Sequence, residues 1–589
     1  MLGDQTPLRK RGKDTVEGER AKCLQRILDS DATHKLVIAG PGTGKTYTFG
    51  RLLEKDPGNS LVLTLINNLV DEMQKEIGEL ADVRTFHSYS RRKLHEHPFG
   101  GITTNFHFFP GLTRIINGDS LILHKAGLLE RGYAEDELGI AFRLLIENDG
   151  RIEFFLERAN YYDAVGFDDS VYRVLSLFNA DSGTIPTYHY VMVDEFQDFN
   201  ELEVTFLASL EDSSRMLIVG DDDQSLYHFR QASPDHLRAK ANDARYQRFS
   251  LPYCTRCTAT VIAAMEHVIE GAQALGLLND RLDKDFVCYL PEKQADNEAY
   301  PKIRIATCSV QRGNAPYISR YIESVVSALP ATEVELALKH NYPLALVVGE
   351  SHYLRQIYDY LSERLSNVVY KPSSRFPITV LDGFGLLLER EDSNLGWRIV
   401  LQFLAPEDLE EFVISSAKGR TPLIELVDEP FKAQQLARIE ILRRAAEDSD
   451  NTSPGEIEAL EELFSLPIQE ILESVSKPSQ DVDQETRSGE EDLSMSEPTI
   501  LLTTYNGSKG LSAGFTFITG LEENVFPNAN DQPSFTEICQ LIVALMRTRK
   551  QCHLIHTKNF AGKWTNRSVF LDWIPEELSE RIQVDKGFF

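Results

Sequence analysis

Long apolar runs and cysteines are both scarce in this sequence. No apolar stretch approaches the ~20 residues that a membrane-spanning helix needs, and the first residues contain no apolar signal core. The seven cysteines are odd in number and thinly spread over 589 residues, which argues against a disulfide framework. We therefore expect a protein of the reducing cytoplasm with no membrane partner.

Positive charge is also in deficit. The chain has 61 Lys and Arg residues against 90 Asp and Glu residues, a net charge of −29 that is unfavourable for a nucleic-acid partner. The excess is concentrated, because residues 447–497 contain 16 acidic and 2 basic side chains. We interpret this segment as a partly disordered linker around a helix near Leu460–Leu472, with a strand-mimicking acidic flap as the alternative. The basic run at residues 9–13 is typical of a loose tail.

Residues 36–46, LVIAGPGTGKT, predict a phosphate-binding loop between a strand and a helix. Its glycines have no side chains to block phosphates, so backbone N–H groups can point at them beneath the positive end of the helix. Lys45 would reach the outer phosphates and Thr46 would ligate Mg²⁺. The alternative is a glycine turn with an incidental lysine. The expected ATP-binding residues here are Ala39 (in place of the usual glycine), Gly40, Pro41, Gly42, Thr43, Gly44, Lys45 and Thr46.

Asp194 and Glu195 end a second apolar run, YHYVMVDEFQD at residues 188–198. Ligands gather at the carboxyl ends of strands in open α/β sheets. Asp194 is therefore expected to hold Mg²⁺, and Glu195 to orient and deprotonate the attacking water. The alternative is a strand that merely ends in polar residues, and the upstream phosphate loop argues against it.

A third strand ends in the acidic turn of RMLIVGDDDQSLYHFRQAS, residues 215–233. Together with the two preceding motifs, this segment resembles the superfamily 1 DNA helicases of the UvrD/Rep/PcrA type. The resemblance implies that Gln224 senses the γ-phosphate, while Tyr227 and Phe229 lie against the bases of a single strand. Aromatic faces stack on any base for roughly 1–3 kcal/mol each. Core packing is the alternative for both rings.

Two further blocks are similar to family motifs that carry arginines. They are LPYCTRCT at residues 251–258, with Arg256, and QLIVALMRTRK at residues 540–550, with Arg547. The resemblance implies that both guanidinium groups reach the transferring phosphate from a second domain. A surface position is the alternative for either one alone. The expected catalytic residues are thus Lys45, Asp194, Glu195, Gln224, Arg256 and Arg547.

The resemblance also implies DNA contacts from several segments, including the block at residues 499–527. In that block Asn506 and Ser512 replace the family's His and Glu, which predicts a looser nucleotide preference. Leu65 and Asn68 replace the usual aromatic residue and lysine, which predicts a weaker grip in the first domain. The expected DNA-binding residues are Thr64, Thr85, Phe86, His87, Tyr227, Phe229, Thr504 and Lys509, with Gly510 assigned to the nucleotide.

Base recognition rests on fewer residues. The family has a glutamine before the phosphate loop, and Gln25 lies at a workable distance from Lys45, with Glu19 as a competing alignment. Thr255 replaces the family's adenine-stacking tyrosine, although Tyr253 lies two residues earlier. The family therefore implies ATP, but these residues leave the base contacts open.

Cys254 and Cys257 form a CxxC pair inside the Arg256 block. A closed zinc site needs four ligands, and no second pair or His cluster is near in the sequence. We therefore expect two packed thiols, with a metal or redox role as the alternative.

The length exceeds the ~150 residues of a typical domain several times over, so several domains are expected. The resemblance implies an α/β fold with two RecA-like parallel-sheet domains, as in P-loop NTPases, and two mostly helical insertions. We expect a first sheet domain at 1–100 and 187–247, a first insertion at 101–186, a second sheet domain at 248–385 and 499–589, and a short acidic second insertion at 386–498. Residues 303–308 and 344–349 are expected strands of the second sheet, each followed by a helix.

The sequence thus predicts an ATP- and Mg²⁺-dependent DNA helicase that translocates on single-stranded DNA, with the 3′ to 5′ polarity and tailed-duplex substrate implied by the resemblance. The alternative is a DNA-sensing regulatory subunit of a separate nuclease in bacterial genome maintenance, such as DNA repair, or in antiviral (phage) defence. About 30 residues follow the expected last strand at 552–557, too few for a fused nuclease domain. RNA is a third option, because gripping and stacking need no deoxy sugar.

Overall fold

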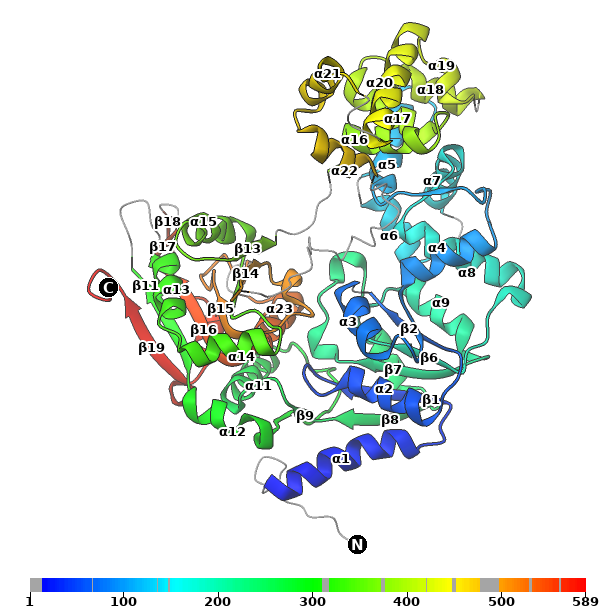
Figure 1. The fold of residues 1–589 in the computed structure, drawn as a ribbon. Helices are drawn as coiled ribbons and strands as arrows, with labels where there is room; N and C mark the ends of the chain where they lie inside the picture. The colour runs from blue at the N-terminus through cyan, green and yellow to red at the C-terminus, as the bar shows by residue number, and fades with distance from the viewer. Residues whose placement is uncertain are drawn as a thin grey trace.

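Two parallel β-sheets lie side by side, and a helical body lies above them (Figure 1). The computed structural model describes residues 13–65, 67–134, 136–146, 149–309, 317–371, 377–419, 421–447, 452–476, 497–528, 532–560 and 563–589. All strand pairs within both large sheets are parallel, which confirms the predicted α/β class. Within the described part of the chain, no helix is both long and apolar enough to cross a membrane.

The first sheet has six strands in the order β3-β2-β6-β7-β1-β8. Their bounds are β1 His34–Ala39, β2 Ser60–Thr64, β3 Asp82–Thr85, β6 Tyr190–Val193, β7 Arg215–Gly220 and β8 Tyr246–Leu251. Side chains alternate between the two faces: Val37 packs with α1 Lys13–Asp29, α2 Lys45–Lys55 and α3 Asn67–Ile77, whereas Leu36 packs with α4 Phe86–Glu96, α8 Phe167–Ala180, α9 Glu201–Glu211 and α10 Asp235–Asn242. Helices therefore cover both faces, as parallel sheets require.

The second sheet has seven strands in the order β13-β14-β12-β15-β16-β11-β19. Their bounds are β11 Ile303–Cys308, β12 Ala345–Val348, β13 Val368–Lys371, β14 Ile500–Thr503, β15 Ala513–Ile518, β16 Thr548–Thr557 and β19 Ser579–Val584. Helices α11 Ala259–Ala274 and α23 Phe535–Leu545 pack on one face, and α13 Tyr317–Ser327 and α15 Ser351–Leu361 on the other. Both strands expected in this sheet are confirmed. The strand at 552–557 is not the last, because β19 follows and pairs with β11.

Shorter elements connect these layers. They are the paired strands β9 Tyr253–Cys254 and β10 Val287–Cys288, the hairpin β17 Asn559–Phe560 and β18 Lys563–Trp564, and the helices α12 Leu290–Ala299 and α14 Ala331–Lys339. β8 corrects one expected boundary: Arg248 pairs with Leu36 of β1, so its strand belongs to the first sheet. The polar, partly exposed sequence of β8 is typical of an edge strand and gave no sign of its partner.

The helical body combines the two expected insertions. Helices α5 Leu112–Lys125, α6 Glu137–Arg143 and α7 Gly150–Tyr162, with short strands β4 His107–Phe108 and β5 Ala164–Val165, come from the first. Helices α16 Val380–Glu389, α17 Asn394–Leu404, α18 Leu409–Gly419, α19 Leu423–Leu426, α20 Glu429–Glu447, α21 Pro454–Phe464 and α22 Ile468–Ser476 come from the second. They stand together at the top of Figure 1, beside α5. α16 packs on α17 and α22, so the second helical body begins before residue 386.

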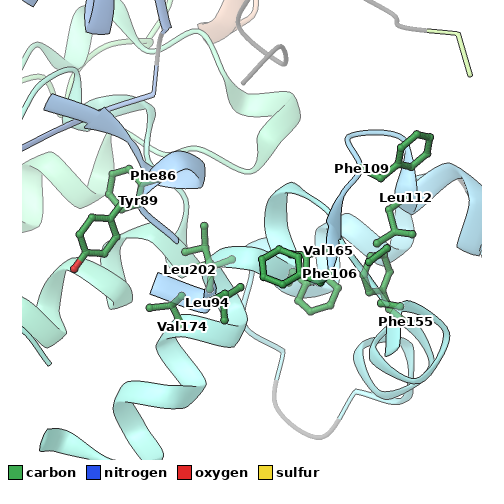
Figure 2. Close-up of a cluster of buried hydrophobic side chains, with 14 of the residues drawn as sticks. Phe86, Tyr89, Leu94, Phe106, Phe109, Leu112, Phe155, Val165, Val174 and Leu202 are labelled. Carbon is green, nitrogen blue, oxygen red and sulfur yellow. The ribbon is translucent and has the colours of Figure 1, made fainter. Parts of the chain in front are cut away.

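One apolar core continues from the first sheet into both insertions. Phe86 and Tyr89 lie beneath that sheet, and Phe106 and Phe155 extend the cluster outward (Figure 2). The apolar island expected in the acidic stretch folds as α21 and α22 and joins this core through Leu460 and other residues. The proposed disorder at residues 477–496 and most of the basic run at residues 9–13 lie outside the described residues.

Candidate nucleotide site

The phosphate-loop motif folds as a tight turn between β1 and α2. Gly42 and Gly44 have φ values of 69° and 92°, in the left-handed region that glycine adopts at little cost. A Cβ atom on Gly42 would lie 2.5 Å from the Cβ of Arg256. The close approach of the Arg256 segment is therefore a second reason for glycine at this position. Gly44 is the N-cap of α2 and has no side chain, so it makes no capping hydrogen bond to the first backbone N–H groups of the helix. Such an end attracts anions.

Lys45 points across the loop at the carboxylates that follow β6. Its ammonium pairs with Glu195 and lies 3.3 Å from Asp194 Oδ1. Burial disfavours the charged ammonium, but the two carboxylates outweigh it and raise the pKa of Lys45. The lysine is therefore a fixed cation beside the glycine turn, and Thr46 follows it in the first turn of α2.

Asp194 and Glu195 have different environments although they are neighbours. Glu195 has a φ of 53°, and the amide of Gln197 donates to its Oε2 at 2.6 Å. Burial would raise the pKa of Glu195, but Lys45 and Lys509 lower it, whereas burial raises the pKa of Asp194. Glu195 is therefore held as the carboxylate, the form that a general base requires.

Gln224 lies in the short helical turn that follows β7 and is buried. Its side-chain amide donates to Asp221, and its backbone carbonyl accepts a 3.0 Å hydrogen bond from Lys509 Nζ. Lys509 also pairs with Asp198 and lies 3.5 Å from Glu195 Oε2. A lysine from the second half of the chain thus connects Gln224 to the carboxylates beside the phosphate loop.

The two expected arginines come to the same place. The backbone N–H of Thr255, next to Arg256, donates to the carbonyl of Gly42 at 2.8 Å. Arg547 is buried, and its guanidinium donates to the carbonyl oxygens of Val543 and Leu511 at 3.0 and 3.1 Å. Neither arginine forms an ion pair with any residue that the structure describes.

Burial, reinforced by the Arg256 guanidinium, lowers the pKa of Arg547 to about 9, while Glu195 counteracts the shift. Arg256 and Arg547 destabilise each other's charge, and neither is paired with a carboxylate in the described part of the chain. The binding of an anion between them is therefore favourable. One site is therefore surrounded by the phosphate loop, the two carboxylates, Gln224 and both arginines. These groups come from segments of both sheets.

Comparison with known proteins agrees with this arrangement. The model of the UvrD/REP helicase N-terminal domain matches residues 22–110 and 147–245. An ATP-dependent DNA helicase PcrA of Staphylococcus aureus is 26% identical over 646 residues, covering 92% of this chain and 84% of the relative. These matches support a helicase of the UvrD/Rep/PcrA type. An ATP-dependent DNA helicase PcrA of Staphylococcus epidermidis is 25% identical to this chain over 637 residues, covering 92% of this chain and 84% of the relative.

Several residues of this site were not predicted from the sequence. Lys284 forms hydrogen bonds with Asp222 at 2.6 Å and pairs with Asp221 and Asp223, and Arg281 Nη2 lies 2.6 Å from Asp223 Oδ2. The three carboxylates are close enough to hold a metal ion, but the lysine ammonium bonds to all of them. Three adjacent aspartates favour a nearby cation, but their partners Arg281 and Lys284 lie about 60 positions away and could not be inferred from the sequence.

Gln25 does not face the site. Its amide donates to Asp29 Oδ1 at 2.7 Å along the exposed side of α1. Glu19, the competing alignment, instead accepts a 3.2 Å hydrogen bond from the hydroxyl of Tyr253. In α1, Glu19 therefore lies beside Tyr253, whereas Gln25 bonds to Asp29. Gly510 has a φ of 82° and open space at its Cβ position.

Most of the expected DNA contacts are buried in this conformation. Phe86 is 0% exposed and packs edge-on against Phe199, so its assignment to DNA is wrong. Figure 2 shows Phe86 beside Tyr89 at one end of the drawn apolar cluster. Burial lowers the pKa of His87 to about 3, and its ring packs on Phe167. Lys509 is buried beside Gln224 and Glu195 and therefore belongs to the nucleotide site.

The other expected DNA-binding residues divide into two groups. Thr64 is buried at the end of β2, and Thr85 is buried where its hydroxyl accepts from Ser88 N and caps α4. Phe229 is 62% exposed and packs edge-on against Tyr227. The distance from the Tyr227 ring centroid to Lys509 Nζ is 5.5 Å. Thr504 is half-buried and accepts from Gly507 N. Leu65 is buried, while the Asn68 side chain lies outside the described part of the structure.

Cys254 and Cys257 are free, buried thiols. The Cys254 thiol donates to the carbonyl of Pro41 in the phosphate loop at 3.2 Å. Among described residues, the acidic triplet 221–223 is the only group with metal-ligand spacing, so the expected packing role of the thiols stays the simpler interpretation.

Proposed function

We propose that this chain is an ATP-driven motor that moves on single-stranded DNA and unwinds tailed duplexes, with 3′ to 5′ polarity. The observation that carries the proposal is the convergence of Arg256 and Arg547 on the Lys45 and Glu195 side of the phosphate loop. Arginines from one sheet and a phosphate loop from the other make nucleotide contacts sensitive to the distance between the sheets. The names of the staphylococcal relatives support the same activity.

The residues divide the chemistry among them. Lys45 and the loop N–H groups would bind the β- and γ-phosphates, and Thr46 and Asp194 have the oxygen donors that would hold Mg²⁺. When bound, Mg²⁺ neutralises phosphate charge. Glu195, ionised and oriented by Gln197, would accept the proton of the attacking water. Arg256 and Arg547 would stabilise the charge on the transferring phosphoryl group.

Coupling to DNA would run through Gln224 and Lys509. Gln224 lies five residues before Phe229, the exposed ring of this segment. Lys509 bonds to the backbone carbonyl of Gln224, so a nucleotide that shifts the Gln224 backbone would disturb the Lys509 contacts to Asp198 and to the Tyr227 ring. Movement of these aromatic residues would then change the grip on stacked bases.

We also propose a revised domain division. The first sheet domain would comprise residues up to 100 and 187–251, and the first insertion 101–186. The second sheet domain would comprise 252–379 and 497–589, and the second insertion 380–496. The strand pairing of β8 and the packing of α16 support the two changed boundaries.

The test compares the purified full chain with Lys45→Ala. We expect wild-type hydrolysis of ATP to rise on addition of single-stranded DNA, and strand displacement from a 3′-tailed duplex to exceed that from 5′-tailed and blunt duplexes. Lys45→Ala should lose hydrolysis by at least roughly a hundredfold, since the phosphates lose their main cation. A matched control is Lys55→Ala, at the other end of α2, where the ammonium pairs with Asp29.

Two outcomes would contradict the proposal. If Lys45→Ala still hydrolysed ATP, the assignment of the nucleotide site to the phosphate loop would be wrong. DNA-stimulated hydrolysis without displacement of any duplex would favour the regulatory subunit of a nuclease, and equal displacement of RNA duplexes would remove the choice of DNA.

A further inference from the structure

A pocket of about 530 Å³ lies between the N-terminal half of α1 and the chain that leaves β8. Its lining includes three carboxylates (Glu19, Asp283 and Asp285), three basic side chains (Lys22, Arg26 and Arg248) and the rings of Phe249 and Tyr253. The volume is in the range of small-ligand sites, and a nearly planar purine is a suitable occupant.

The pocket adjoins a second cavity that reaches the phosphate loop. Ile38 and Asp285 line both this pocket and a smaller cavity whose wall includes Gly40 and Pro41 of the loop. Tyr253 also precedes Cys254, whose thiol donates to the Pro41 carbonyl. A nucleotide with its phosphates on the loop can therefore direct its base toward Glu19.

The hydrogen-bonding chemistry of this wall differs from that of a glutamine. An ionised carboxylate only accepts hydrogen bonds, whereas a glutamine amide both donates and accepts. Adenine offers a donor, N6–H₂, next to acceptors at N1 and N7, which matches an amide. Guanine offers two adjacent donors, N1–H and N2–H₂, which match the two oxygens of a carboxylate.

The opposite edge of guanine is complemented as well. Its O6 and N7 atoms are acceptors that arginine and lysine commonly bind. Lys22, Arg26 and Arg248 supply such donors in the same pocket. With adenine, one Glu19 oxygen would face a ring nitrogen lone pair, and that unpaired contact costs binding.

We propose that this pocket holds the nucleotide base and that Glu19 makes the chain use GTP at least as well as ATP. The inference rests on the proposed nucleotide-driven function, because it names the base that the same site accepts. The hydroxyl of Tyr253 donates to Glu19 Oε2 and so orients the carboxylate as a positioning residue.

The experiment measures kcat/KM for ATP and GTP with the full chain and single-stranded DNA. We expect a GTP to ATP ratio of at least one for the wild type. In Glu19→Gln the ratio should shift toward ATP by roughly tenfold, because one bidentate base contact is exchanged for another. The change should be in KM more than in kcat, since Glu19 contacts the base and not the reacting phosphate.

Glu17→Gln is the matched control, because Glu17 lies two residues away on the same helix and is exposed. Its GTP to ATP ratio should equal that of the wild type. Anisotropy of fluorescent GDP and ADP gives a second measurement that does not depend on turnover, and it should show the same shift in affinity.

The inference is overturned if wild-type protein uses ATP clearly better than GTP, or if Glu19→Gln leaves the ratio unchanged in both measurements. Those results leave the motor proposal intact, because hydrolysis and displacement still occur. If neither nucleotide is hydrolysed with DNA present, the proposed function itself fails.

Discussion

At the scale of single residues, charge placement decides what the site can bind. Lys45 is neutralised by Glu195 and Asp194, whereas Arg547 and Arg256 have no carboxylate partner among the described residues. A triphosphate would therefore bring to the arginines the negative charge that they lack, and would compete with Glu195 for Lys45. This competition would release the carboxylate for its role toward water.

Phe229 is the residue whose removal separates hydrolysis from strand binding. Its ring is 62% exposed, and it makes no contact with the phosphate loop in the described interactions. We expect Phe229→Ala to lower the affinity for single-stranded DNA roughly tenfold, because a stacked ring contributes about 1–3 kcal/mol. Hydrolysis without DNA should not change. Fluorescence titration and DNA-stimulated hydrolysis measure the two effects.

Phe403→Ala is the control for that variant, since Phe403 is an exposed phenylalanine on α17. If Phe229→Ala bound and responded to DNA as the wild type does, the coupling role of this ring would be wrong.

Glu522 gives the protein a predictable dependence of stability on pH. Burial raises its pKa to about 7, against hydrogen bonds from Thr557 N and the Tyr353 hydroxyl that lower it. Between pH 4.5 and 7 the folded protein keeps a proton that the unfolded chain has released, so stability falls as pH rises through this window. Glu522→Gln, which mimics the protonated form, should remove that loss.

The expected gain in unfolding free energy for Glu522→Gln at pH 8, relative to its effect at pH 5, is on the order of 3 kcal/mol. Thermal unfolding of both proteins over this range measures it. Glu577→Gln, at an exposed carboxylate, should show no such trend. A constant difference between Glu522→Gln and the wild type at all pH values would contradict the assignment.

At the scale of elements, a buried charge cluster joins the two helical insertions. Asp119 on α5 accepts from Arg398 on α17 at 2.9 Å and from Arg158 on α7 at 2.6 Å. Burial would raise the pKa of Asp119, but the two arginines lower it. Three helices far apart in the sequence thus depend on one carboxylate.

Asp119→Ala should loosen this junction, because it leaves two buried guanidinium groups without their anion. The expected loss is about 3–5 kcal/mol, as for other broken buried pairs. Hydrogen exchange of α16 to α22 should increase along with a lower unfolding temperature. Lys125→Ala is the control: Lys125, also on α5, pairs with Glu410 on α18 but is exposed, so its loss should cost at most about 1 kcal/mol. Equal effects of both changes would refute the junction.

At the scale of the whole molecule, the two sheets are connected by charged side chains around the nucleotide site. Lys284 pairs with residues 221–223, and Lys509 pairs with Asp198. Both lysines lie beyond β8, and their partners belong to the segments that follow β6 and β7. The contacts that join the sheets are therefore the same ones that a nucleotide would rearrange.

Lys284→Ala should let the sheets separate, because it leaves a cluster of buried carboxylates with fewer cations. We expect a larger radius of gyration in small-angle scattering without nucleotide, and a return toward the wild-type value with Mg²⁺ and a non-hydrolysable ATP analogue. Lys302→Ala is the control, since Lys302 bonds to carbonyl oxygens of residues 576 and 579 in its own half. An unchanged radius for Lys284→Ala would show that other contacts hold the sheets.

Individual residues show which parts of the fold and the site were predictable from the sequence. The strand, turn and helix around Lys45 were predictable, because glycine spacing and apolar runs act locally. Gln25 and Phe86 were not placed correctly, since a motif alignment does not say which face of a helix is turned inward. The domain boundary expected at residue 248 falls inside β8, because the pairing of this strand with β1 depends on segments far apart in the sequence.

The amino-acid sequence by itself determined the parts of the site, since each motif forms its own turn from neighbouring residues. Only the tertiary structure decided that Lys509 and Lys284 belong to this site and that Glu19, not Gln25, lines the adjoining pocket. The physical reason is that local backbone preferences act over a few residues, whereas ion pairs and pockets form between segments that only the packed chain brings together.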